Sequence, residues 1–114
     1  MKTWLRMSRK VIILNAAKPD FREIKTYVLF QFGKEVWNEV FEEFKTTINN
    51  IGLYPEAGAE IEELKELIQE TFRIRLVRQT RIVYEYDDKE VLIHMFIHTM
   101  RDFRAHLLKR LLNV

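Results

Sequence analysis

Basic side chains in the last third of the chain are the residues best suited to bind or act on another molecule. Arg73 and Arg75 stand two residues apart in an alternating segment that begins at Phe72, so a strand would place both on one side. The residues expected to extend this basic patch are Arg81, Arg101, Arg104, Lys109 and Arg110. Such a patch could bind an acidic peptide, a protein surface or a nucleic-acid backbone.

Metal-free RNA cleavage is one chemistry that these residue types permit. It requires a base for the 2′-hydroxyl, an acid for the leaving oxygen and cations for the phosphate. The candidates for these roles are His98, His106, Arg81 and Arg101. The competing interpretation is that the arginines are solvated or ion-paired and that the histidines cap secondary-structure elements. The residue types alone favour this second interpretation.

The sequence predicts no metal and no cofactor. His94 and His98 are four residues apart on a predicted strand, where that spacing separates them by about 13 Å, so they would not share a metal ion. We expect His94 to be a partly buried sheet residue. The chain has no Cys, no Gly-rich phosphate loop and no HExxH motif, which leaves no thiolate site and no cysteine nucleophile.

Hydrophobic periodicity predicts the elements that position these residues. The predicted elements are a strand over Lys10–Asn15 buried on both faces, a helix from Pro19 and Asp20 to a Gly33 cap, a helix over Lys34–Ile51 ended by Gly52, a turn over Leu53–Gly58, an ambiguous segment over Ala59–Thr71 that fits a short helix, three strands from Phe72 to His98, and a helix over Thr99–Leu112. The last strand is apolar on both faces, which predicts a central position in the sheet. Asp87, Asp88 and Lys89 form the predicted turn before it.

The fold class that follows is α+β in a single domain spanning residues 1–114. One antiparallel sheet carries a helical hairpin packed on one face, in the order strand, two helices, three strands, helix. A chain of 114 residues with 47% hydrophobic residues can bury one modest core. No apolar run approaches the roughly 20 residues of a membrane span, so we expect no membrane partner.

Charge is segregated along the chain beneath a net charge of +2. Residues 1–10 carry four basic residues and no acidic ones, residues 11–70 carry six basic and twelve acidic ones, and residues 71–114 carry nine basic and five acidic ones. This division predicts either solvated faces of amphipathic elements or a surface for an acidic partner. The absence of Cys fits a reducing cytoplasm as the location.

Three segments together resemble the RelE/ParE superfamily of bacterial type II toxins, over about residues 8–112. They are KVIILNAAKPDFREIKTYV, FGKEVWNEVFEEFKTTINNIGLYPEAG and FRIRLVRQTRIVYEYDDKEVLIHMFIHTMRDFRAHL. The RIVYEY strand, the acidic turn, the apolar strand ending in His98 and the RD pair after it are the most specific part. The long hairpin around Gly33 and the IGLYPEAG exit are more similar to the ParE branch. Residues 1–7 precede the usual family start, which predicts an N-terminal extension with Met7 as a possible initiator.

The resemblance implies a toxin that binds DNA gyrase and blocks replication, held inactive by a cognate antitoxin in a hetero-oligomeric complex. The wide apolar stripe of the hairpin and the arginines of the sheet favour an extended, acidic and apolar antitoxin segment that folds on binding. Its expected contacts are Phe21, Tyr27, Trp37, Phe41, Arg73 and Arg75. The expected gyrase contacts lie at the end of the last strand and in the final helix, at His98, Arg101, Arg104, His106, Lys109 and Arg110.

Two alternatives stay open within the resemblance. One is a ribosome-dependent mRNA endoribonuclease of RelE type, for which Arg73, Arg75, Arg81, His98 and Arg101 approximately match the basic positions. Where such enzymes carry a further catalytic Tyr or Arg, this chain has Phe103, Arg104 and His106. The other alternative is an inactive relative that only binds its antitoxin.

Overall fold

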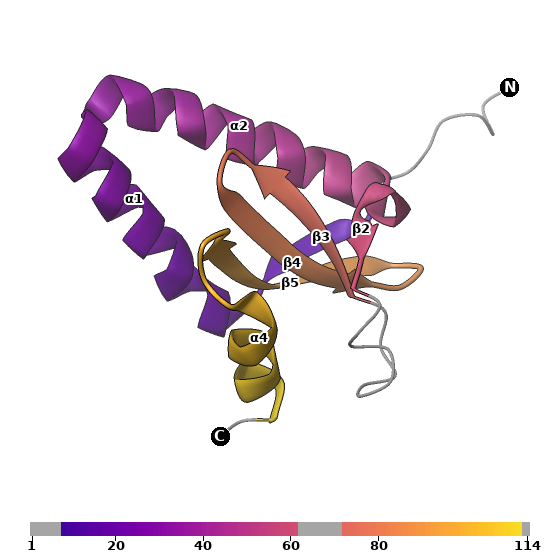
Figure 1. Ribbon diagram of the computed structural model, residues 1–114. Coiled ribbons are helices and arrows are strands. Elements are labelled where there is room, and N and C mark those ends of the chain that lie inside the picture. Colours follow the sequence, from indigo (N-terminus) through magenta and orange to yellow (C-terminus); the bar gives the residue numbers. More distant parts are fainter. Residues whose placement is uncertain (1–7, 62–71, 113–114) are drawn as a thin grey trace, which may run out of the picture.

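The computed structural model describes residues 8–61 and 72–112. Its helices and strands (Figure 1) are β1 Lys10–Ile13, α1 Lys18–Phe32, α2 Lys34–Leu53, β2 Ala59–Glu60, β3 Phe72–Val77, β4 Thr80–Tyr86, β5 Glu90–His98 and α4 Phe103–Leu112. Two short 3-10 turns, η2 Asn15–Ala17 and η3 Pro55–Ala57, precede α1 and follow α2. The predicted α+β fold, with its helical hairpin and final helix, is confirmed. The predicted extension over residues 1–7 lies outside the described residues.

The five strands form one sheet in the order β1-β5-β4-β3-β2. All neighbours are antiparallel, as predicted, except β1 and β5, which are parallel. The long α1–α2 connection permits this parallel pairing, which a tight turn could not. β5 pairs on both sides, so its predicted central position is confirmed. The prediction that the first strand is buried on both faces is wrong, because β1 is an edge strand and Val11, Ile12 and Ile13 are half-buried.

The segment after α2 differs from its prediction. Ala59 and Glu60 are extended and pair with Ile74 and Arg73 of β3, so a helix does not begin at Ala59. Backbone hydrogen bonds to β3 outweigh the helix-like composition there. The rest of the predicted short helix, residues 62–71, lies outside the described residues. The predicted turn before β5 is confirmed, with Asp87 Oδ1 accepting hydrogen bonds from the backbone N–H of Lys89 at 2.8 Å and Glu90 at 2.9 Å.

The sheet is covered on both faces, by the hairpin on one and by α4 on the other (Figure 1). The core under the hairpin includes Val40, Phe44 and Ile51 of α2 with Ile82, Tyr84, Val91, Ile93 and Phe96 of the sheet. The core under α4 includes Val83, Met95, Ile97, Phe103 and Leu107. Alternation along β4 and β5 sends neighbouring apolar side chains into these two separate cores.

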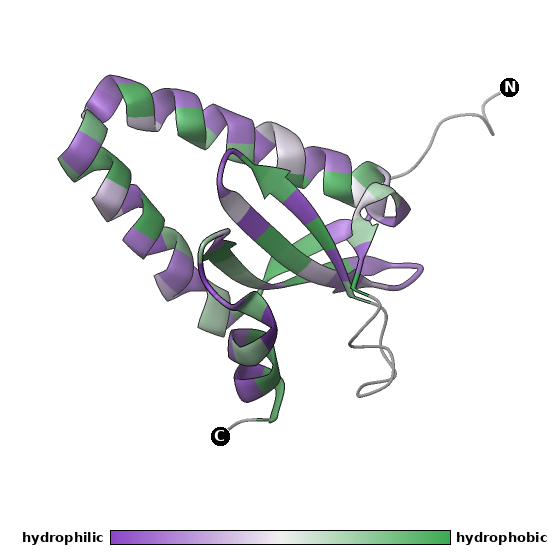
Figure 2. Cartoon of the chain, viewed as in Figure 1, coloured by the Kyte–Doolittle hydropathy of each residue, from purple (hydrophilic) through white to green (hydrophobic). Residues whose placement is uncertain are grey.

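The two arms of the hairpin pack unequally. α2 buries Trp37, Val40, Phe44 and Ile51, whereas α1 has no fully buried residue. Gly33 joins the arms with a φ of 90°, and its N–H donates to the carbonyl of Leu29 at 3.1 Å, which confirms it as the cap of α1. Hydrophobic residues nonetheless continue along both arms (Figure 2), so α1 leaves apolar surface uncovered. None of the described helices, α2 included, could cross a membrane.

Candidate functional site

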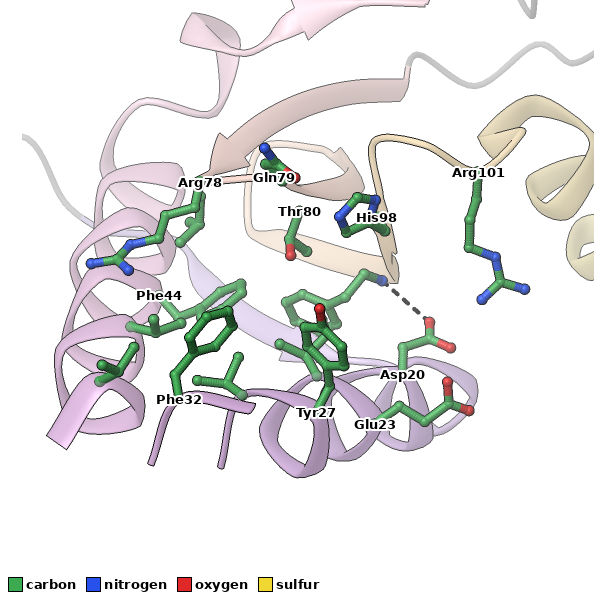
Figure 3. Close-up of a pocket in the computed structure, with 16 residues that line it drawn as sticks. Asp20, Glu23, Tyr27, Phe32, Phe44, Arg78, Gln79, Thr80, His98 and Arg101 are labelled. Carbon is green, nitrogen blue, oxygen red and sulfur yellow. Dashed lines mark hydrogen bonds between the residues drawn. The ribbon is translucent and has the colours of Figure 1, made fainter. Parts of the chain in front are cut away.

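A groove of about 700 Å³ lies between the hairpin and the end of the sheet. Its apolar wall comes from both helices and from β5, and comprises Ile24, Tyr27, Val28, Phe32, Val36, Val40, Phe44 and Phe96. Figure 3 shows Tyr27, Phe32 and Phe44 facing the polar residues of the β3–β4 turn and of the end of β5. The groove therefore offers an apolar wall with polar groups along one rim.

Large aromatic side chains stand exposed beside this groove, at the end of α1. Tyr27 is 59% exposed, Phe32 59% and Phe30 80%, and Leu29 beside them is 36% exposed. Tyr27 and Phe32 contact each other edge to face, with ring centroids 6.3 Å apart. A cluster of exposed aromatic residues is typical of an interaction surface. The hairpin thus presents both the groove and an apolar lip to a partner.

Asp20 lies at the other end of the groove and holds three parts of the molecule together. Its Oδ2 accepts a hydrogen bond from Arg110 Nη1 at 2.7 Å, and its Oδ1 accepts one from Nη2 at 3.2 Å. Oδ2 also accepts the backbone N–H of Phe96 at 3.2 Å, as Figure 3 shows. This bidentate ion pair joins the first turn of α1 to the last turn of α4.

Arg101 lines the same end of the groove, in the connection from β5 to α4. Its Nη2 lies 3.1 Å from Nε2 of His106, while Nδ1 of His106 lies 2.8 Å from the carbonyl oxygen of Asp102. A guanidinium can only donate, so Nε2 is the acceptor and Nδ1 carries the proton in this arrangement.

Arg78 forms the opposite rim of the groove, in the turn between β3 and β4. It has a φ of 53°, an uncommon value for a residue with a side chain. Its guanidinium contacts both carboxylate oxygens of Glu43, at 2.7 to 3.1 Å, and lies 3.7 Å from Glu39. The hydrogen bond from Arg78 holds the pKa of Glu43 below its usual value. The charge of Arg78 is thus already paired with α2.

Of the predicted antitoxin contacts on the hairpin, only Tyr27 lines the groove. Trp37 is buried, and Phe21 packs between Trp37, Phe44 and Phe96 with ring centroids 5.1 to 5.7 Å apart. Phe41 is 39% exposed but does not line the groove. The periodicity of these aromatics indicated an apolar face correctly, but most of that face is core.

Arg73 and Arg75 lie on the hairpin face of the sheet, away from the groove. Arg73 Nη1 donates to the carbonyl oxygens of Glu56 at 2.7 Å and Gly58 at 3.1 Å, so this side chain secures the chain segment after α2. Tyr84 Oη beside it donates to the carbonyl of Pro55 at 2.6 Å, and burial raises the pKa of Tyr84 to about 12. Arg75 is half-buried and forms no hydrogen bond or ion pair within the described residues.

The predicted gyrase-contact residues are mostly available on the surface. His98, Arg101, Arg104, His106 and Lys109 are exposed. Arg110 is the exception, because it is half-buried in its ion pair with Asp20. The structure thus places five of the six residues where another macromolecule could reach them.

Of the side chains named for RNA cleavage, His98 and Arg101 both line the groove, whereas the other three arginines lie elsewhere on the sheet. Arg73 and Arg75 lie on the hairpin face, whereas Arg81 pairs opposite Leu76 and points to the α4 face, 4.6 Å above the ring of Phe103. Arg81 also donates to the carbonyl of Thr99 at 3.1 Å. Backbone carbonyls thus hold both Arg73 and Arg81. Arg73 and Arg75 lie on the sheet face opposite Arg81.

His94 is a partly buried sheet residue, as predicted. Its Nε2 lies 2.7 Å from Glu85, and its ring contacts Phe72. No group of three or more potential metal ligands occurs among residues 8–61 and 72–112.

Asp20, Glu23 and Arg78 are site residues that the sequence did not single out. The sequence indicates Asp20 only as a helix start, and Glu23 and Arg78 resemble ordinary solvated charges. Glu23 follows Asp20 by one helical turn, so the two carboxylates share the helix face that carries the apolar stripe. This spacing is the signal in the sequence that points to them as neighbours in the site.

Residues 11–103 match the family described as ParE toxin of type II toxin-antitoxin system, parDE. The chain belongs to the ParE toxin family. The predicted relationship to the ParE branch is thereby confirmed, and the chain is a ParE-type toxin of a type II toxin-antitoxin system. This family context supports an antitoxin as a partner.

The fold of this ParE family member is similar to a solved structure titled "Chromosomal ParDE TA system from P. aeruginosa". The two chains superpose with a TM-score of 0.63 at 13% sequence identity, over 80% of this chain and 96% of the other. At that identity the likeness shows a shared fold. No curated protein matches the chain.

Proposed function

We propose that this ParE-family toxin inhibits growth by binding DNA gyrase and blocking replication, and that a cognate antitoxin neutralises it by occupying the groove. The family match over residues 11–103 is the observation that carries the proposal. The structure supports a binding mode of action, because its prominent features are an apolar groove and an exposed basic helix. The proposed place of action is the cytoplasm, where replication occurs.

The antitoxin segment in this proposal packs its apolar side chains against the hairpin wall of the groove. Tyr27 and Phe32 supply exposed aromatic surface at the lip, and buried aromatic contacts carry a large share of interface energy. Phe21 and Trp37 stabilise the wall from within the core and do not themselves touch the partner. Arg73 and Arg75 are not part of this contact, since neither arginine lines the groove.

The gyrase-facing surface in this proposal is the end of β5 together with the exposed side of α4. His98, Arg101, Arg104, His106 and Lys109 are all exposed on this surface. It includes α4, which covers the sheet face opposite the hairpin. Antitoxin and gyrase would therefore share His98 and Arg101, which line the groove, and gyrase alone would contact the exposed side of α4.

Two parallel assays test the target. The purified chain is incubated with gyrase and supercoiled plasmid, and separately with translating ribosomes. Accumulation of cleaved DNA is the expected result. Codon-linked cuts in mRNA would instead identify a RelE-type endoribonuclease, and activity in neither assay would identify an inactive relative that only binds its antitoxin.

A charge-reversal variant tests the gyrase-facing surface. Arg104→Glu combined with Lys109→Glu alters two exposed side chains of α4 and leaves its buried residues Phe103 and Leu107 in place. We expect gyrase inhibition to fall at least tenfold while thermal stability and antitoxin binding are retained. Unchanged inhibition would contradict the assignment of this surface. Lys34→Glu, an exposed residue at the start of α2, is the matched control.

A further inference from the structure

Two residues that line one end of the groove also hold α4, on the other face of the sheet. Asp20 forms the bidentate ion pair with Arg110 in the last turn of α4, with N–O distances of 2.7 and 3.2 Å. Arg101 lies 3.1 Å from His106, in the first half of the same helix. Residues that line the groove thus contact α4 in its first half and in its last turn.

The Asp20–Arg110 ion pair lies beside the part of the β5 edge that β1 does not cover. β1 ends at Ile13, which pairs with Ile93, so among residues 8–61 and 72–112 no strand covers the edge of β5 beyond that point. An irregularity in the β4–β5 register falls here, with Met95 opposite Val83 and Ile93 opposite Tyr84. Arg110 Nη1 donates to the carbonyl of His94 at 2.9 Å, and the N–H of Phe96 donates to Asp20. The pair therefore occupies backbone groups that would otherwise be unpaired.

The position of α4 depends on few contacts besides these. Only Phe103 and Leu107 are buried among its ten residues, and Leu108 and Leu111 pack partly against the same core. A helix of this length is marginal in isolation, so its order comes from its attachments. Loss of one polar attachment should measurably loosen it.

Glu23 makes the groove end sensitive to an added cation. It lies one helical turn after Asp20 on the groove wall, is exposed, and forms no ion pair within the described residues. A Lys or Arg side chain that enters this end meets the carboxylates of both Glu23 and Asp20. Asp20 carries a single negative charge that Arg110 already neutralises, so a second cation beside it repels the guanidinium and weakens that ion pair.

We propose that a groove occupant that presents a basic side chain to Asp20 and Glu23 weakens the Asp20–Arg110 ion pair and thereby loosens α4. An antitoxin with such a residue would act on the gyrase-facing helix from the opposite face of the sheet. The coupling is reciprocal, so a target that holds α4 in place would weaken binding of that basic residue in the groove. The identity of occupant and target rests on the proposed function, whereas the weakening of the Asp20–Arg110 ion pair does not.

Glu23→Lys tests this weakening within the chain itself, because it places a cation one turn from Asp20. Glu23→Gln is the matched control, since it removes the same negative charge without adding a cation. Hydrogen–deuterium exchange of the amides of residues 103–112 is the measurement. We expect exchange to be roughly three- to fivefold faster in Glu23→Lys than in Glu23→Gln, the factor expected from weakening a partly exposed ion pair. Equal exchange in the two variants would overturn the proposal.

Arg110→Gln provides an independent check. This variant should accelerate exchange of α4 by itself, and adding Glu23→Lys to it should then have no further effect. An additive effect would mean that the lysine acts by another route. These readouts do not involve gyrase, so they can stand while the gyrase assay fails, and the gyrase assay can succeed while they fail.

Discussion

Arg78 lies 2.7 Å from Glu43, and this ion pair fastens the β3–β4 turn to the middle of α2. The contact closes one side of the groove, since Arg78 lines it and Glu43 stands on the helix that forms its wall. It also pairs the charge of Arg78, whose φ of 53° places it at the tip of the turn.

Stability should depend on pH at this pair. Because the pKa of Glu43 is lowered in the folded state, its contribution is present above its unfolded pKa, near 4.5, and is lost as pH falls through the lower folded pKa. Thermal unfolding followed by circular dichroism between neutral and acidic pH is the measurement. Glu43→Gln should lose less stability than the wild type over this acidic window. An identical pH profile in both proteins would contradict the assignment.

The buried phenol of Tyr84 should make the stability of the fold depend on pH in the alkaline range. Its pKa is raised by burial from 10.0 to about 12, so its contribution is present below pH 10 and is lost as pH rises towards 12. Tyr84→Phe removes the hydrogen bond to Pro55 and should reduce the free energy of unfolding at neutral pH by about 1 kcal/mol.

Ultraviolet absorbance of ionised tyrosine measures this titration directly. The difference between wild type and Tyr84→Phe should show one phenol ionising well above pH 10. Tyr27→Phe, which alters an exposed phenol, is the matched control. A difference curve for Tyr84 centred at an ordinary tyrosine pKa would refute the prediction.

Two glycines should respond to alanine for different reasons. A Cβ on Gly52 would lie 2.9 Å from Ser8 Oγ and 3.1 Å from Val11 Cγ2, so Gly52→Ala should separate α2 from β1 and destabilise the fold by about 1–3 kcal/mol. Gly33 has open space around it but a φ of 90° with a ψ of 176°, so Gly33→Ala should destabilise by about 1–3 kcal/mol through backbone strain alone. Urea unfolding of both variants gives these values. A neutral Gly52→Ala would argue against close packing of α2 on β1.

The aromatic lip of the groove should matter for antitoxin binding and little for folding. Tyr27→Ala and Phe32→Ala truncate exposed side chains that line the groove, so each should change the free energy of unfolding by less than about 0.5 kcal/mol. Affinity for the antitoxin, measured by calorimetry, should fall roughly tenfold or more. Phe30→Ala is the control, because Phe30 is 80% exposed but does not line the groove. Equal losses at Phe30 and Tyr27 would place the antitoxin elsewhere.

Charge reversal separates the two arginines that the sequence placed in one antitoxin-binding patch. Arg73→Glu should lower the melting temperature, because it removes the hydrogen bonds to Glu56 and Gly58. Arg75→Glu should leave both stability and antitoxin affinity nearly unchanged, since Arg75 lies outside the groove. A marked loss of antitoxin affinity in Arg75→Glu would show that the antitoxin does contact the arginines of the sheet.

Local patterns in the sequence determined most of the elements of this protein. Alternation from Phe72 to Ile97 predicted the three antiparallel strands, Gly33 predicted the break between the helices, and Asp87 predicted the turn before β5. These features depend on backbone conformation and side-chain periodicity over a few residues, which are visible in the chain itself. The segments that carry the family resemblance were recognisable for the same reason.

Only the tertiary structure decided which of these residues form the site. Tyr27 and Trp37 belong to the apolar stripes of α1 and α2, yet packing buries Trp37 and leaves Tyr27 at the groove lip. The same packing joins Asp20 to Arg110, 90 residues away in the chain. Periodicity specifies the apolar side of an element but not the neighbour that covers it. The packing of distant segments decides which helices cover the two faces of the sheet. It therefore also decides the shape of the groove and its link to α4.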